Sequence, residues 1–263
     1  MDIQDNPSTK GDLMSNRLEF SFWRAFARHL RESVRYYGVI RTLHELLAVI
    51  CRVLRHHTQA LRHTENRDLD FDLEHKVDTT RSNVSLRMQL TTAFVGHEYG
   101  PSEPWLFEQI MHALPVEFTD YTFIDLGSGK GRSLLMAATH PFRRILGVEF
   151  MPDLHRAAER NISQQPAVRQ HVRQMESFCM DARDFSFPLE PSVLYLFNPF
   201  PEPVLATVLT NARRSLADNP RPFFVAYRDP EHEHLLENCA WLEKLSGTQE
   251  WAIYKGIGCL PSF

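Results

Sequence analysis

The sequence predicts an α/β protein in which an N-terminal helical extension precedes a doubly wound, mainly parallel sheet. From residue 121 onward, short apolar runs alternate with segments of helical character, as in parallel sheets joined by helices. Residues 17–66 instead carry apolar side chains at helical spacing. Glycine is scarce, with 11 in 263 residues, yet Gly127, Gly129 and Gly131 fall together after the first apolar run. Such a cluster indicates an unusual backbone turn.

Bulk composition excludes several classes of protein. Hydrophobic residues make up 43% of the chain and charged residues 24%, as in ordinary globular domains, so the chain is not wholly disordered. The formal net charge of −4 argues against a basic nucleic-acid binder. The first residues lack the pattern of a secretory signal, and no apolar run approaches the roughly 20 residues of a membrane span. The four cysteines form no ligand pair. We expect a cytoplasmic protein with no transmembrane segment and no metal site.

Composition divides the chain into four segments. We expect a flexible polar tail, a basic amphipathic helical extension, a connecting or lid segment and a main domain, at residues 1–16, 17–66, 67–100 and 101–263. The connecting segment has no clear periodicity and ends in glycine and proline, which is typical of a loop.

The extension differs from the rest of the chain in charge. It carries nine arginines against four glutamates, which is +5, so the remainder carries −9. Its two apolar stripes, separated by Gly38, predict two amphipathic helices. The first interpretation is that the stripes pack on the main domain with the arginines in solvent. The others are a basic surface for nucleic acid or an acidic macromolecular partner, and a helix pair lying on a membrane surface.

In the main domain, strands and helices follow one another along the chain. Strands are predicted at residues 121–126, 144–150, 177–180, 193–197, 222–227 and 251–254. Helices are predicted at residues 105–114, 131–139, 151–165, 202–216 and 232–239. Ligands of such sheets bind beyond the carboxyl ends of the strands, so the residues directly after each strand are the candidates for function.

The turn after the first strand has the pattern D-x-G-x-G-x-G, from Asp125 to Gly131. Two phosphate-binding motifs do not fit it. The dinucleotide fingerprint needs a third glycine where Arg132 stands, and the phosphate-binding loop of nucleotide hydrolases needs a glycine where Ile124 stands. The glycines remain suited to close approach of a ligand to the backbone at the start of a helix.

This turn resembles the first motif of class I S-adenosylmethionine-dependent methyltransferases. The resemblance implies a seven-stranded Rossmann-like sheet, S-adenosylmethionine as cofactor, and cofactor contacts from Asp125, Gly127, Ser128, Gly129 and Gly131. The chemistry agrees, because this cofactor has no phosphate and carries an ammonium and a sulfonium, which a neighbouring carboxylate suits.

The next two strand ends fit the same family. Glu149 follows Gly127 by 22 residues, at the distance typical of an acid that binds ribose hydroxyls. The resemblance implies that Phe150 packs on the adenine, that Asp181 accepts from its amino group, and that the amide of Ala182 binds a ring nitrogen. Asp184 is the competitor of Asp181, which could otherwise cap a turn.

The fourth strand ends in Asn198-Pro199-Phe200, which is similar to the N-P-P-[YF] motif of nitrogen-directed methyltransferases without its second proline. The resemblance implies that these three residues are catalytic, with Asn198 also beside the cofactor, and that Tyr99 covers the methionine end of the cofactor. The order of motifs also resembles the core of non-SET histone-lysine methyltransferases and a group of uncharacterised bacterial methyltransferase-like proteins.

The leading hypothesis is therefore methyl transfer from S-adenosylmethionine to an unidentified acceptor, with nitrogen as the target atom in a protein lysine, a nucleobase or a small molecule. A second hypothesis is a non-catalytic cofactor-binding or scaffold protein that acts through its basic N-terminal helices. A third is a nicotinamide-dependent oxidoreductase, which Arg132 disfavours.

Overall fold

The computed structural model describes residues 23–47, apart from 25, 29, 33, 45 and 46, together with residues 66–80, 102–165 and 174–257. The predicted tail (1–16), Tyr99 and most of the predicted lid segment lie outside these residues. Among the described residues, no helix combines the length and apolarity needed to cross a bilayer.

Seven strands form one sheet. They are β1 (Thr122–Leu126), β2 (Arg144–Glu149), β3 (Met175–Cys179), β4 (Ser192–Phe197), β5 (Phe223–Arg228), β6 (Leu242–Gly247) and β7 (Trp251–Gly256). Their order across the sheet is β3-β2-β1-β4-β5-β7-β6. The strands β1 to β5 pair in parallel, and β7 runs antiparallel to β5 and to β6. The strand order reverses between β1 and β4, so their carboxyl ends flank the point where such sheets bind ligands.

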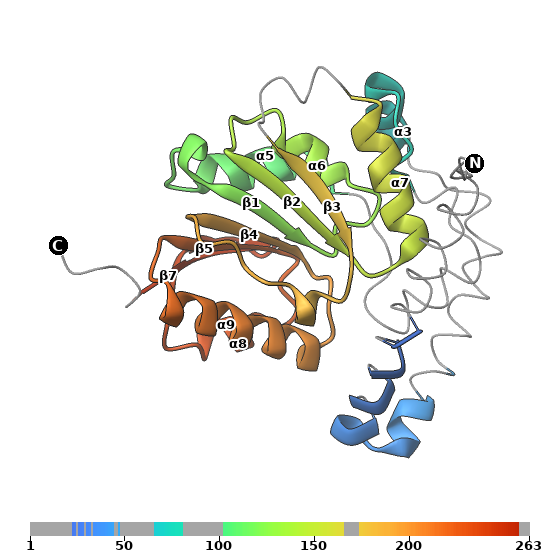
Figure 1. Cartoon of the computed structure of the whole chain (residues 1–263), viewed down its shortest axis with the longest axis vertical. Coiled ribbons are helices and arrows are strands. Elements are labelled where there is room, and N and C mark those ends of the chain that lie inside the picture. The colour runs from blue at the N-terminus through green and yellow to red at the C-terminus, as the bar shows by residue number, and fades with distance from the viewer. Residues whose placement is uncertain are drawn as a thin grey trace, which may run out of the picture.

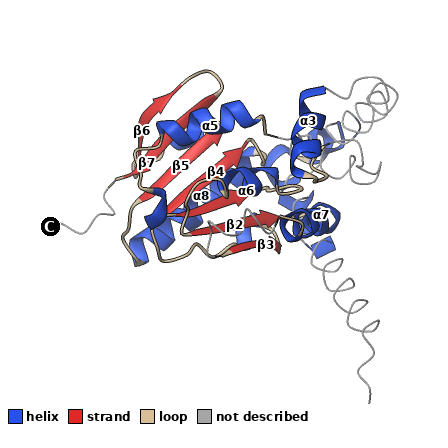
Figure 2. Ribbon diagram, turned by 90° about the horizontal axis from the view of Figure 1, so that it is seen from above, coloured by secondary structure: helices blue, strands red, loops and turns tan. Residues whose placement is uncertain are grey.

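Helices cover both faces of the sheet (Figures 1 and 2). They are α3 (Asn66–His75), α5 (Pro104–Ala113), α6 (Arg132–Ala137), α7 (Pro152–Ser163), α8 (Glu202–Asp218) and α9 (Glu233–Glu237), with short 3-10 turns η2 (Phe118–Asp120) and η4 (Ala182–Asp184). Neighbouring strand residues point to opposite faces. Phe123 packs with α5 and α6, whereas Ile124 packs with α8. Apolar packing on both faces therefore fixes the positions of the strands and of the residues at their ends.

Two elements depart from the sequence prediction. The predicted connecting segment contains α3, whose acidic sequence has little apolar periodicity and which buries Phe71 and Asp72. The edge strand β6 was not predicted, because its side chains are mostly exposed and polar and it forms a hairpin with β7. The remaining helices and strands lie within a few residues of their predicted places, as is usual for element boundaries.

The N-terminal helix pair comprises the helical residues between 23 and 37 and between 39 and 47. The predicted break is confirmed, since Gly38 has a φ of 81°. The second helix does not pack its apolar stripe on the main domain. Val39, Ile40, Leu43 and Leu47 are 58%, 86%, 53% and 61% exposed, and at 100° per residue they share one face. The expectation that both stripes are covered is therefore wrong for the described residues of this helix.

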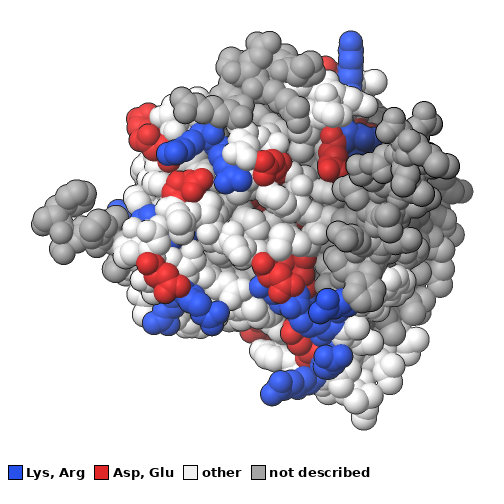
Figure 3. Space-filling view, viewed as in Figure 1, with Lys and Arg blue, Asp and Glu red and all other residues white. Residues whose placement is uncertain are grey.

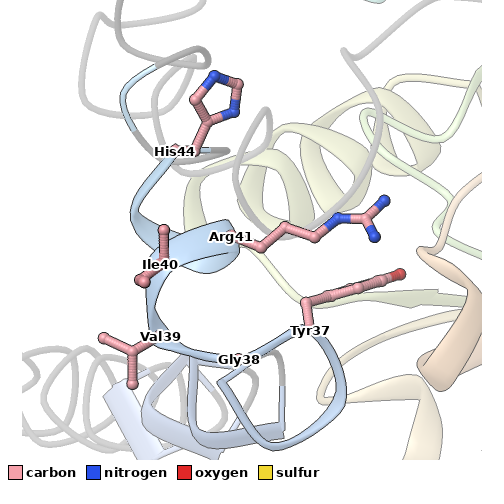
Figure 4. A pocket seen from close by; sticks show the side chains of 6 residues that line it. All are labelled: Tyr37, Gly38, Val39, Ile40, Arg41 and His44. Atoms are coloured by element: carbon pink, nitrogen blue, oxygen red, sulfur yellow. The ribbon is translucent and has the colours of Figure 1, made fainter.

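An open hollow lies beside the break at Gly38 and is lined by Tyr37, Gly38, Val39, Ile40, Arg41 and His44 (Figure 4). The guanidinium of Arg41 lies 5.2 Å from the centroid of the Tyr37 ring on one side of the hollow. Val39 and Ile40 point to the opposite side. The lining includes none of the strand-end residues, so the hollow is separate from the predicted site.

Candidate functional site

The three glycines after β1 form a tight turn. Gly127, Gly129 and Gly131 have φ values of 93°, 54° and 84°, in the left-handed region that glycine tolerates best. The N–H of Gly127 donates to the carbonyl of Val148 at 2.8 Å, which ties the turn to β2. A Cβ atom on Gly127 would lie 2.5 Å from the Cβ of Pro199. The turn after β1 is therefore in direct contact with the segment after β4.

Asp125 lies within β1 just before the turn and is 3% exposed. Its carboxylate accepts a hydrogen bond from the hydroxyl of Ser133, in α6. Burial raises the pKa of Asp125 to about 7; the Ser133 hydroxyl lowers this pKa and the nearby charge of Glu149 raises it. The buried carboxylate has no ion-pair partner among the described residues.

Glu149 ends β2 and is 6% exposed. Its Oε2 accepts from the N–H of Gly129 at 2.8 Å, and its Oε1 accepts from the N–H of Met151 at 2.7 Å. Burial raises the pKa of Glu149 to about 7, against the lowering effect of backbone N–H groups at Met151, Gly129 and Phe150. A carboxylate offers about four lone-pair sites, so three backbone donors leave one open for a ligand.

The two cations of the glycine turn are both buried and bind residues 78–80. The ammonium of Lys130 donates to Asp78 Oδ1 at 2.9 Å and to the carbonyl of Thr80 at 2.7 Å. Arg132 Nε donates to the hydroxyl of Thr79 at 2.6 Å. The residue that breaks the dinucleotide fingerprint therefore has a structural role on the side of α3.

Asp72 of α3 organises this contact. Its carboxylate accepts from the N–H groups of Thr79 and Thr80 at 2.8 and 2.9 Å and from Arg132 Nη2 at 3.3 Å. The guanidinium of Arg132 also lies 4.7 Å from the centroid of the Phe71 ring. The sequence pattern did not reveal this support of the glycine turn.

Asp181 follows β3 and caps η4. It accepts from the backbone N–H of Arg183 at 2.9 Å, and from Nε and Nη2 of the same side chain at 3.0 and 2.7 Å. Burial by itself would raise the pKa of Asp181, but hydrogen bonds and charge from Arg183 lower it below its ordinary value. The next residue, Ala182, is buried against the core beside α8.

Asn198 follows β4 with a φ of 38° and is 2% exposed. Its Oδ1 accepts from the hydroxyl of Tyr227 at 3.3 Å, and that hydroxyl accepts from the N–H of His232 at 3.4 Å. Its Nδ2 has no hydrogen-bond partner in the described part of the chain. A buried amide donor without a partner is costly in an ordinary core and points to a ligand.

The structure brings most of the predicted residues to one edge of the sheet. The glycine turn, Asp125, Glu149 and Asn198-Pro199 meet around the ends of β1, β2 and β4, while Asp181 and Ala182 lie beyond β3. Phe150 joins a small apolar cluster of Met151, Leu154 and Phe26, and Phe200 packs partly on the core near α8. Ser128 is buried, and its hydroxyl lacks a partner among the described residues. The prediction for Tyr99 concerns a residue outside the described ranges.

Two further residues at this edge were missed. Arg228 ends β5 opposite Phe197, its guanidinium lies 3.7 Å from the centroid of that ring, and it pairs with Glu103. Tyr227, beside it, holds Asn198. Both residues follow from applying the strand-end rule to the fifth strand as well as to the first four.

The residues present fit S-adenosylmethionine. Asp125 and Glu149 are buried, have pKa values raised to about 7 and form no ion pair within the described residues, as suits a site for a cationic ligand with hydroxyl groups. The left-handed glycines keep side chains off the turn between them.

Residues 80–188 match the family model described as histone methylation protein DOT1, over less than half of the chain. This match spans β1, the glycine turn, Glu149 and Asp181. Over these residues the chain is similar to the DOT1 family of methyltransferases. No curated protein matches the chain.

Several solved structures are similar to the chain at low sequence identity. An RNA methyltransferase from Salinibacter ruber with S-adenosyl-L-homocysteine is 20% identical over 60% of this chain and 92% of its own, with a TM-score of 0.37. A TehB-like methyltransferase from Corynebacterium glutamicum is 14% identical over 57% and 86%, with a TM-score of 0.40. The glycopeptide N-methyltransferase MtfA with S-adenosyl-L-methionine is 9% identical over 63% and 90%, with a TM-score of 0.44.

Proposed function

We propose that the protein is an S-adenosylmethionine-dependent methyltransferase that acts on a nitrogen atom, and that Asn198 lies beside that atom. The observation that carries the proposal is the buried Asn198 amide at the switch point, with one bond to Tyr227 and an unpartnered Nδ2. Oδ1 keeps a second lone pair, so the amide can accept an N–H from the target and donate to a neighbouring oxygen.

The cofactor roles of the strand-end residues belong to the same proposal. Asp125 and the turn from Gly127 to Gly131 hold the methionine part, and Glu149 accepts from the ribose. Phe150, Asp181 and the amide of Ala182 bind the adenine. Their supports are the burial of the acids and the open lone pair of Glu149.

In this arrangement the cofactor supplies an activated methyl group, and the chain supplies position and electrostatics. The target nitrogen must present its lone pair in line with the methyl–sulfur bond. Asn198 is held by Tyr227, so it orients the nitrogen through an accepted N–H, and Pro199 sets the distance between this segment and the glycine turn. Alignment of this kind contributes several kcal/mol, up to about 7–11 in ideal intramolecular cases.

The test is transfer of labelled methyl from S-adenosylmethionine into fractionated cell extract, separated into protein, RNA, lipid and small molecules. We expect Asn198→Ala to bind the cofactor normally and to lose roughly 100-fold in turnover, the usual cost of one oriented polar group at a reaction centre. Equal loss of binding and turnover would make Asn198 structural. Cofactor binding with no label in any fraction would favour the scaffold hypothesis.

Other features of the chain complete the proposal. The lid role of residues 67–100, the contact from Tyr99, the division into four segments and a cytoplasmic location remain predictions.

The N-terminal helix pair is proposed to bind an acidic macromolecular partner, supported by exposed Arg24, Arg31, Arg35 and Arg41. On the face seen in Figure 3, acidic and basic side chains are interleaved, so this surface is not uniformly basic.

A further inference from the structure

The first N-terminal helix is tied to the end of β3 by contacts that span more than 150 residues of sequence. Arg28 reaches Asp181 and Asp184, and Glu32 pairs with Arg183. Phe26 packs against the cluster that contains Phe150. The helix therefore lies over the residues proposed to bind the adenine.

The hydrogen bonds of Asp181 leave no room for a further donor. Its carboxylate has about four lone-pair sites. Three N–H groups of Arg183 take three of them, at distances of 2.7 to 3.0 Å. Arg28 Nη2, 2.7 Å from Oδ2, takes the fourth. An adenine amino group can bind Asp181 only when Arg28 withdraws.

The competing acid is held by the same side chain. Arg28 donates to Asp184 through Nη1 at 2.9 Å and through Nη2 at 2.7 Å, a two-pronged contact of the strong kind. These bonds to Asp184, partly offset by burial, raise the pKa of Arg28 above its ordinary value. Whichever of the two acids receives the adenine, its oxygens are already in contact with Arg28.

We infer that Arg28 gates the adenine end of the cofactor site by competing with the adenine amino group for the carboxylates beyond β3. This inference rests on the proposed function, in which one of these acids binds the adenine. Cofactor binding then requires the first N-terminal helix to release this edge, and anything that draws the helix away strengthens binding.

The contact has the properties that a reversible gate needs. The Arg28 side chain is 34% exposed and that of Asp184 is 56% exposed, so salt screens their attraction. The second tether, from Glu32 to Arg183, is also partly exposed, with Glu32 at 40%. Neither tether is a deeply buried pair that only unfolding would break.

The experiment measures binding of S-adenosyl-L-homocysteine to the full chain by calorimetry, at low and at high salt. We expect Arg28→Ala to bind roughly fivefold more tightly than the wild type at low salt, because one charge-assisted competitor is gone. The wild type should gain affinity as salt rises, and Arg28→Ala should lose this dependence. Arg31→Ala, an exposed arginine on the same helix, is the matched control and should behave as the wild type.

Glu32→Gln gives an independent readout, because it loosens the helix without touching Asp181 or Asp184. It should also tighten binding, by roughly twofold. Weaker binding in both Arg28→Ala and Glu32→Gln would show that the helix forms a wall of the cofactor pocket. Unchanged binding would show that Arg28 and Glu32 have no role in cofactor binding. Either result overturns the proposed gate. Failure of the proposed function looks different, since the wild type and all variants would then not bind the ligand.

Discussion

Glu149 and Asp181 are carboxylates at the ends of neighbouring parallel strands, yet their surroundings shift their pKa values in opposite directions. Glu149 accepts from backbone N–H groups of its own turn and the adjacent glycine turn, and burial raises its pKa to about 7. Asp181 is held by the guanidinium groups of Arg183 and Arg28, which lower its pKa. Two acids at corresponding strand ends therefore differ in pKa because their hydrogen-bond donors differ in charge.

These opposite pKa shifts indicate which of the two carboxylates gains more from a bound ligand. A buried carboxylate that has only neutral backbone donors keeps an open lone pair and gains from a donor group of a ligand, such as a hydroxyl, whereas a carboxylate between two guanidinium groups is already neutralised. We therefore expect Glu149 to dominate cofactor affinity and Asp181 to dominate the attachment of the N-terminal helix.

The largest expected effect is that of Glu149→Ala. It removes the acceptor of a ribose hydroxyl and leaves the N–H groups of Gly129 and Met151 without their partner. Affinity for S-adenosyl-L-homocysteine should fall roughly 1,000-fold, about 4 kcal/mol, as measured by calorimetry. Asp153→Ala, an exposed acid in the first turn of α7, should bind as the wild type. A loss of affinity below tenfold would contradict the expectation that Glu149 dominates cofactor binding.

The second effect tests the turn that supports Glu149. Gly127→Ala places a methyl group 2.5 Å from the Cβ of Pro199 at a φ of 93°, so it should lower the free energy of unfolding by about 2–3 kcal/mol. Gly38→Ala is the matched control, because φ is 81° there but nothing lies within 4 Å of the added carbon. It should cost only about 1 kcal/mol, from backbone strain. Denaturant titration measures both, and equal losses would show that the contact with Pro199 is unimportant.

The third effect is the dependence of stability and of ligand binding on pH. Asp125 and Glu149 have pKa values near 7 in the fold, above about 4 in the unfolded chain, so their contribution to stability is complete below pH 4 and is lost as the pH rises through 7. Ionisation over the same range should tighten binding of S-adenosyl-L-homocysteine about tenfold between pH 6 and pH 8. Glu149→Gln should flatten this rise. The lowered pKa of Asp181 keeps this residue ionised over the whole range, so it does not contribute to the change in affinity. An affinity of the wild type that did not vary with pH would contradict the raised pKa values of Asp125 and Glu149.

The smallest effect is that of Asp181→Asn on affinity. Asparagine keeps an acceptor oxygen while the attraction to Arg28 falls, so the two changes offset each other and affinity should change by no more than about threefold. Its free energy of unfolding should fall by more than the binding free energy changes, since Arg183 is 4% exposed and loses one of its two ionic partners, keeping only the partly exposed Glu32. If Asp181→Asn lost as much affinity as Glu149→Ala, the two acids would be equivalent and the comparison would fail.

Local features of the chain were predictable. The order of strands and helices follows from runs of apolar residues, and the seven-stranded mainly parallel sheet is confirmed. The glycine turn was also predictable, because positive φ values are a property of individual residues in a strand-to-helix connection. The strand β6 was not, since an exposed edge strand has no apolar pattern to reveal it.

The pattern of strands and helices along the chain was enough to predict that Asp125, the three glycines, Glu149 and Asn198 lie at or just after the carboxyl ends of parallel strands, and hence share an edge of the sheet. The charged groups that meet at this edge could be identified only from the folded chain. Arg28 and Asp184 are 156 residues apart, and nothing local distinguishes Arg28 from the other arginines of its segment. Such pairings depend on how the N-terminal helix packs against the end of β3, which is a property of the folded chain as a whole.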